Sequence, residues 1–111
     1  VNNGTSGTYL RLSSCMDEKN NRLVSAYILA NNYGAVVVCE FKSDGTMVAG
    51  TPVIYASEAV KTPGVVYDEQ AEKVVIGDQR GGTTRLGFTT LDISPDTNTA
   101  TVVDVDDSLM W

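Results

Sequence analysis

The sequence of 111 residues has the length of one domain, enough to bury a modest hydrophobic core. Hydrophobic residues make up 42% of it and charged residues 20%, which are values of a globular protein and not of a disordered one. Its net charge of −6 argues against nucleic acid as a partner, because an acidic surface repels phosphates. No apolar run reaches the roughly 20 residues that cross a bilayer, and the opening residues lack the pattern of a signal peptide, so we expect no membrane insertion.

Alternating apolar and polar residues, separated by turn-forming residues, predict strands along the whole chain. Asn31-Asn32-Tyr33-Gly34 and the Asp44-Gly45 pair are typical turns, because Asn, Asp and Gly favour chain reversal. Pro52 falls within the fourth predicted strand, and since proline has no backbone donor we expect that strand at a sheet edge. No stretch has helical periodicity, so the protein is predicted to be all-β. The predicted strands are 9–15, 22–29, 35–41, 47–55, 64–67, 73–77, 85–93 and 99–105.

The second half of the sequence repeats the first at a shift of 51 residues. Asp17-Glu18 recurs as Asp68-Glu69, and Arg22 recurs as Lys73. In each copy the acidic pair begins a turn between two strands, because an Asp side chain bonds readily to nearby backbone amides. The chain is therefore predicted to be two copies of one β unit.

We predict a single all-β domain, residues 1–111, of two four-stranded antiparallel repeat units that are propeller-blade-like. Two blades cannot close a ring, so three copies in a six-bladed trimer, or a longer chain, would complete one. The alternative is a β-sandwich of two four-stranded sheets, which also hides both apolar faces. The units cover about residues 9–57 and 60–106, and residues 56–62 are expected to link them.

The two cysteines are predicted to be free. Cys15 falls in the first predicted strand and Cys39 in the third, so an intervening strand holds them about 9–10 Å apart. A disulfide requires Cα atoms within about 7 Å. We therefore expect two buried thiols that act as small hydrophobic groups, consistent with assembly in a reducing cytosol.

The residue types point away from catalysis. There is no histidine for a Ser-His-Asp set, and two distant cysteines do not make a zinc site. Asp104, Asp106 and Asp107 lack the glycine and the distal glutamate of a calcium loop. The neighbouring carboxylates of Asp17-Glu18 and Asp68-Glu69 point in different directions, unlike the facing pair of a glycosidase. We predict that the chain is not an enzyme and has no catalytic residue, metal or cofactor.

Two loops carry the candidate contact residues, at equivalent positions of the two units. They contain Asn31, Asn32 and Tyr33 in the first unit and Gln79 and Arg80 in the second. Amide, aromatic and guanidinium groups at one end of a β scaffold suit contact with a sugar or a partner protein. Ordinary exposed turns have the same composition, so both readings stay open.

The unit that runs from Val65-Val66-Tyr67-Asp68 through Lys73-Val74-Val75-Ile76 resembles a repeat of marine bacteriophage tail-fibre and other virion proteins. In the first unit, Gly50-Thr51-Pro52-Val53 supplies the last strand of that repeat. The resemblance implies a structural virion component, a tail fibre or surface adhesion module, assembled in the host cytoplasm. Its implied partners are other virion proteins, further copies of the chain and a host surface glycan. The alternative is a blade pair from a propeller enzyme or from a cellular carbohydrate- or protein-binding module.

Apolar residues of the predicted strands also indicate self-association. Val36, Val38, Leu23, Val74 and Ile76 are too many large side chains for two open sheets to cover. Each forfeits about 1.5–3 kcal/mol if it stays in water, and unpaired strand edges favour pairing as well. We expect an oligomer, with a trimer favoured because viral fibres are commonly threefold.

Overall fold

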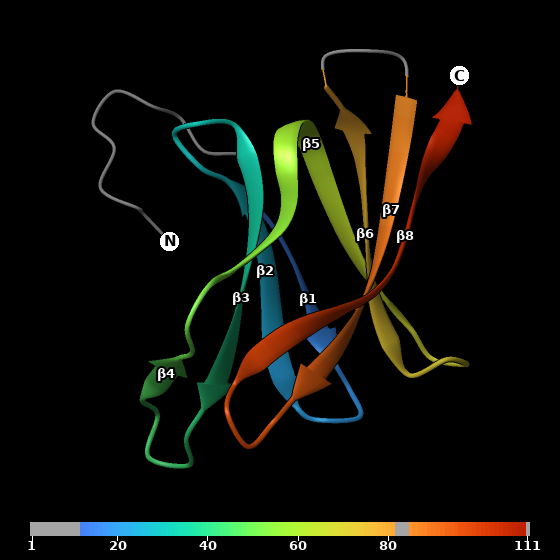
Figure 1. Cartoon of the computed structure of the whole chain (residues 1–111). Helices are drawn as coiled ribbons and strands as arrows, with labels where there is room; N and C mark the ends of the chain where they lie inside the picture. The colour runs from blue at the N-terminus through green and yellow to red at the C-terminus, as the bar shows by residue number, and fades with distance from the viewer. Residues whose placement is uncertain (1–11, 82–84, 111) are drawn as a thin grey trace.

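The computed structural model describes residues 12–81 and 85–110, and side chains as far as residue 108. These residues form antiparallel strands and no helix, so the all-β prediction is confirmed (Figure 1). The described part of the chain accordingly contains no helix able to span a membrane. The start of the first predicted strand, residues 9–11, lies outside the described residues. The strands are β1 (Leu12–Asp17), β2 (Arg22–Ile28), β3 (Tyr33–Phe41), β4 (Met47–Ala49), β5 (Val53–Asp68), β6 (Lys73–Arg80), β7 (Arg85–Ser94) and β8 (Thr99–Met110).

The internal repeat appears in the geometry of two hairpin turns. Asp17 Oδ1 accepts hydrogen bonds from the backbone N–H groups two and three residues later, at 3.1 and 3.3 Å. Asp68 Oδ1 accepts the equivalent pair at 3.0 and 3.3 Å. The last turn residue has positive φ in both copies, 55° at Asn21 and 56° at Glu72. The two units therefore reverse the chain by the same local mechanism, as the repeated acidic pair predicts.

The strands form one sheet in the order β1-β2-β3-β5-β6-β7-β8, with β4 also paired to β3. β5 belongs to both halves, because its first part pairs with β3 and its second part with β6. Residues 56–62 do link the two units, and they do so as the middle of this strand. The fourth predicted strand is shorter than expected: β4 ends at Ala49, and Pro52 lies in the break before β5.

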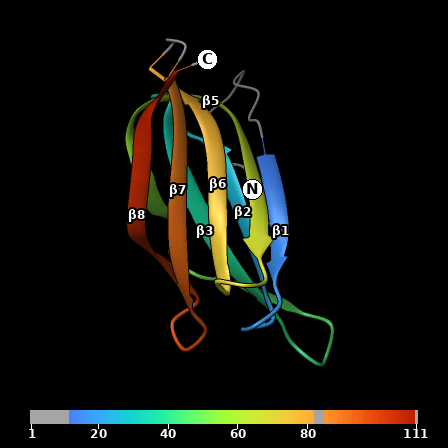
Figure 2. The same cartoon turned by 90° about the vertical axis from the view of Figure 1, so that its right-hand side faces the viewer.

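A bend in β5 brings the two halves of the sheet face to face around one core (Figures 1 and 2). Val24 and Val38 contribute from the first half, and Ile76 and Leu91 from the second, all at most 1% exposed. The units are thus joined through β5 and share a core, an arrangement closer to the sandwich alternative than to separate blades.

This core changes the argument for self-association. Val36, Val38, Val74 and Ile76 were expected to need a partner chain, but they are at most 1% exposed within one chain. Leu23 is half-buried. The expectation that the two units alone cannot cover Val36, Val38, Val74 and Ile76 is therefore wrong, because it treated the units as open sheets.

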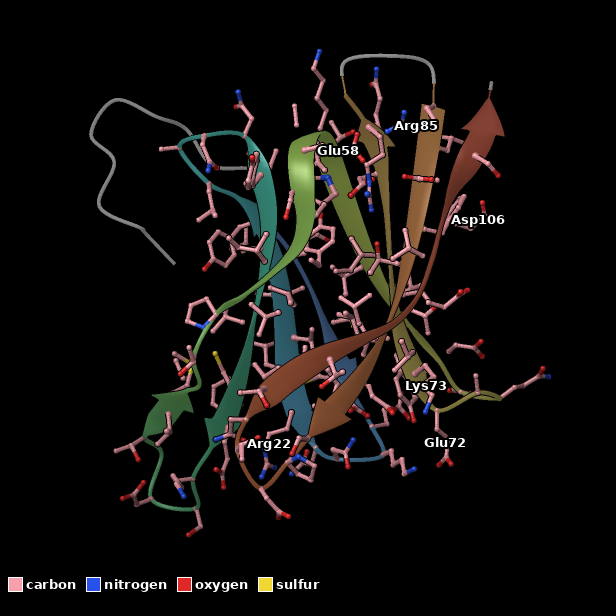
Figure 3. All side chains as sticks on the ribbon, in the orientation of Figure 1. Arg22, Glu58, Glu72, Lys73, Arg85 and Asp106 are labelled. Atoms are coloured by element: carbon pink, nitrogen blue, oxygen red, sulfur yellow. The ribbon has the colours of Figure 1, made fainter. Side chains whose placement is uncertain are left out.

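Arg22 joins the two halves at the end of the molecule that carries the β1–β2 turn (Figure 3). Its Nε donates to Asn98 Oδ1 at 2.7 Å, and its Nη2 donates to the carbonyl of Pro95 at 3.1 Å. Lys73, its counterpart in the repeat, instead pairs with Asp92 at 2.6 Å on a more exposed surface. Equivalent positions of the repeat therefore have different structural roles.

Cys15 and Cys39 are both free, as predicted, and β2 lies between them. Cys15 packs against the main core, whereas Cys39 belongs to a second apolar cluster on the other face of the first half. The strand order and the opposite faces together prevent a disulfide.

Candidate functional site

The two loops that carry the predicted contact residues lie at the same end of the molecule (Figure 1). The middle of β5 connects them: Val60 N–H donates to the carbonyl of Asn32 at 3.0 Å, and Gly81 N–H donates to the carbonyl of Ala59 at 2.6 Å. Equivalent loops of the two units are therefore held by one strand that the sequence suggested was a linker.

The five predicted residues differ in exposure. Asn31 and Asn32 are exposed, and Tyr33 and Gln79 are half-buried. Arg80 is only 2% exposed and is the last residue of β6. The prediction that this strand ends at residue 77 and that Gln79 and Arg80 lie in a loop is wrong, because β6 continues to Arg80, which faces the same side as the buried Asp78. The surface at this end thus presents the two asparagines more than the arginine.

Arg80 and Asp78 form the centre of a buried polar network. Arg80 Nε donates to Asp78 Oδ1 at 2.6 Å, and Arg80 Nη2 donates to the hydroxyl of Thr89 at 2.8 Å. The hydroxyl of Tyr55 donates to Asp78 Oδ2 at 3.0 Å. Burial raises the pKa of the Asp78 carboxyl, although the adjacent guanidinium of Arg80 acts in the opposite direction. Burial likewise raises the pKa of Tyr55, so its hydroxyl keeps its proton and remains a donor.

Glu58 extends this network to the surface (Figure 3). Its carboxylate lies 3.7 Å from Arg80 Nη1 and accepts a hydrogen bond from Arg85 Nη2. Arg85 also lies 4.0 Å from Asp107 on β8. The network therefore connects β5, β6, β7 and β8.

Two glycines provide the space for the network. A Cβ at Gly87 would lie 2.3 Å from Arg80 Nε, and a Cβ at Gly34 would lie 2.5 Å from the Tyr55 ring. A larger side chain at either position would therefore displace Tyr55 or Arg80. The alternating Asp78 and Arg80 could have indicated a shared inward face of a strand, but the nearby Gly81-Gly82 favoured a loop instead.

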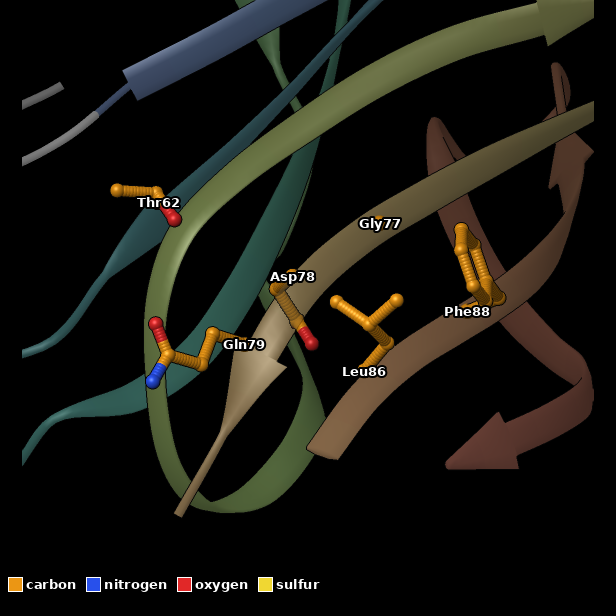
Figure 4. Close-up of a pocket in the computed structure, with 6 residues that line it drawn as sticks. All are labelled: Thr62, Gly77, Asp78, Gln79, Leu86 and Phe88. Atoms are coloured by element: carbon orange, nitrogen blue, oxygen red, sulfur yellow. The ribbon is translucent and has the colours of Figure 1, made fainter. Parts of the chain in front are cut away.

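A shallow hollow of about 220 Å³ lies on the second half of the sheet (Figure 4). Phe88 borders it and lies over Gly77, where an added Cβ would come within 3.3 Å of the ring. Thr62 at its rim has φ of 48°, an unusual conformation for a β-branched residue. The residues that line the hollow are Thr62, Gly77, Asp78, Gln79, Leu86 and Phe88.

Large apolar side chains are exposed on the outer face of the first half, the face away from the shared core. The register places Leu12 opposite Tyr27 and Ile54 opposite Ala35, both members of the second apolar cluster. Tyr27 and Ala35 are buried, whereas five large apolar side chains on this face of the first half are 40–54% exposed. We call these exposed side chains the apolar rim: Leu12, Met16, Phe41, Met47 and Ile54.

Within the described residues, no three acidic or cysteine side chains come together as a metal site would require. No protein-family model, curated protein or solved structure matches the chain.

Proposed function

We propose that the chain is a non-enzymatic structural module that associates with further copies of itself through the apolar rim. The observation that carries this proposal is the gathering of large exposed side chains on one face. Phe41 and Met47 are each 54% exposed and lie opposite each other on β3 and β4. Exposed apolar patches of this kind commonly mark protein interfaces.

Burial of the rim would favour association. Fully burying a large apolar side chain contributes about 1.5–3 kcal/mol, so a half-exposed one retains roughly 1 kcal/mol to gain. Several such side chains acting together give a useful driving force, although association also costs translational and rotational freedom.

The virion role and the trimer extend this proposal. The resemblance of the repeats to tail-fibre proteins supports a structural component of a virion, assembled in the host cytoplasm, that also contacts other virion proteins. The acidic surface is consistent with a protein that does not bind nucleic acid.

Light scattering coupled to size-exclusion chromatography tests self-association at micromolar concentrations. We expect a trimer for the native chain and a monomer for the Phe41→Ser/Met47→Ser variant. Val66→Ser is the matched control, because Val66 is 61% exposed on the second half and should leave the mass unchanged. A native monomer refutes association, and an oligomer that survives the rim substitutions refutes this surface.

A second candidate function is binding of a surface glycan, which the hollow beside Phe88 favours. An aromatic ring with a nearby amide, here that of Gln79, provides both the apolar surface and the polar group that small-ligand sites combine. Binding of the labelled protein to a glycan array tests it. Phe88→Ala should remove the signal, whereas Val66→Ser should not, and equal signals for both variants would refute the site.

A further inference from the structure

β8 forms an open edge of the sheet. It runs from Thr99 to Met110 and pairs with β7 along one side, and no described strand pairs with its other side. A long edge strand presents backbone donors and acceptors that can pair with another chain. Strand addition to such an edge is a common mode of peptide recognition.

From Asp104 to Asp106, beyond an irregularity in the register between Val102 and Asp104, the side chains along this edge alternate in chemistry. Asp104 lies opposite Thr90 and Asp106 opposite Phe88, which places both carboxylates on the outer face of the sheet. Val105 lies opposite the buried Thr89 and thus points toward the inner side, yet it is 45% exposed. The edge therefore presents acidic groups on one side and uncovered apolar surface on the other.

The two carboxylates are available for an external cation. Among the described side chains, Asp104 and Asp106 form no ion pair. Asp106 Oδ1 accepts hydrogen bonds from the backbone N–H and the hydroxyl of Ser108, at 3.2 and 3.0 Å, which leaves its negative charge unneutralised. Because the Ser108 N–H is already bonded locally, the edge open to pairing ends near Asp106.

We propose that the free edge of β8 binds an extended segment of another protein, in which basic and apolar residues alternate. The segment pairs with the backbone of residues 101–106, on both sides of the irregularity between Val102 and Asp104, over a length of at most about 20 Å. Its basic side chains meet Asp104 and Asp106 on the outer face, and its apolar side chains cover Val105. The β8 edge of a second copy is a poor occupant, because it would bring like charges together.

This inference goes beyond the proposed self-association, which uses the apolar rim of the other half of the sheet. The peptide experiment below uses the Phe41→Ser/Met47→Ser variant alongside the native chain. If the peptide binds the native chain and the rim variant equally, its site is not the apolar rim. Loss of binding in the rim variant would overturn the assignment to β8.

The probe is a fluorescent peptide of alternating lysine and valine, acetylated and amidated, measured by anisotropy at low salt. We expect saturable binding, and about fivefold weaker binding to Asp104→Asn/Asp106→Asn, as expected for two exposed charge pairs. Asparagine keeps the acceptor for Ser108, so the strand should stay intact. The matched control is Glu18→Gln/Glu69→Gln, which removes two charges from exposed turns and should bind as the native chain does.

Two further peptides separate strand pairing from simple charge attraction. Both carry the same charges, and in each every second backbone nitrogen is methylated, at the odd positions in one peptide and at the even positions in the other. The peptide whose methyl groups face β8 should fail to bind, because those methyl groups block its hydrogen bonds to the strand. Hydrogen exchange should show new protection within residues 101–106. Absence of binding, equal binding of both methylated peptides, or protection confined to other strands would each overturn the proposal.

Discussion

Two ion pairs in this protein have the same N–O distance but very different burial, and their removal should have very different costs. Arg80 Nε lies 2.6 Å from Asp78, with side chains 3% and 0% exposed. Lys73 Nζ also lies 2.6 Å from Asp92, but those side chains are 31% and 52% exposed. The comparison of Asp78→Ala with Asp92→Ala therefore varies solvent exposure at a constant separation.

The expected magnitudes follow from the environment of each remaining cation. Without Asp78, the guanidinium of Arg80 loses its nearest anion and the Tyr55 hydroxyl loses its acceptor, inside the protein. Breaking a buried pair in this way costs about 3–5 kcal/mol. Without Asp92, Lys73 turns to water, and the loss should be at most about 1 kcal/mol. A domain of this size has about 5–15 kcal/mol of stability, so Asp78→Ala should be marginal but foldable.

Urea unfolding followed by far-ultraviolet circular dichroism measures both losses. Asp78→Asn serves as a second variant, because its amide oxygen still accepts a hydrogen bond and it should lose less stability than Asp78→Ala. If Asp78→Ala cost no more than Asp92→Ala, the buried network would not hold the strands together and our account of it would be refuted.

Four further outcomes are expected. Gly50→Ala should destabilise the protein by about 1–3 kcal/mol in urea unfolding, because the added Cβ would lie 1.7 Å from the backbone oxygen of Asn98. An unchanged unfolding midpoint would contradict that close contact. By the same measurement, Asp17→Ala and Asp68→Ala should each lower the free energy of unfolding by about 1 kcal/mol, because each carboxylate accepts hydrogen bonds from two turn amides. A large difference between the two losses would show that the repeated turns differ in energy. Burial raises the pKa of the Cys15 thiol to about 11, so its native-state alkylation, followed by mass spectrometry, should be slow at pH 8 and accelerate up to that pH. Because the pKa of the Cys15 thiol is higher in the folded chain than in the unfolded chain, the free energy of unfolding should fall as pH rises from about 9 to 11. Fast alkylation at pH 8 would refute the partial burial of this thiol.

The sequence by itself determined the features that depend on neighbouring residues. The period of two in the apolar residues predicted strands, because successive strand side chains point to opposite faces. The acidic pairs predicted the turns at Asp17 and Asp68, since an Asp carboxylate bonds to amides within its own turn. The order of the strands was enough to keep Cys15 and Cys39 apart.

Only the tertiary structure decided how the two units combine. The composition of a linker is found at Thr62, Pro63 and Gly64, yet these residues lie within β5. The strand pairs with β3 on their N-terminal side, and it pairs with β6 on both sides of them. Local patterns encode the conformation of short segments, but they do not encode which faces meet. Bending the sheet at β5 buries the apolar faces of both halves at once, and the free energy of that burial depends on contacts between residues far apart in the chain. The same contacts place Arg80 and Asp78 in the interior, where each provides the opposite charge that the other requires.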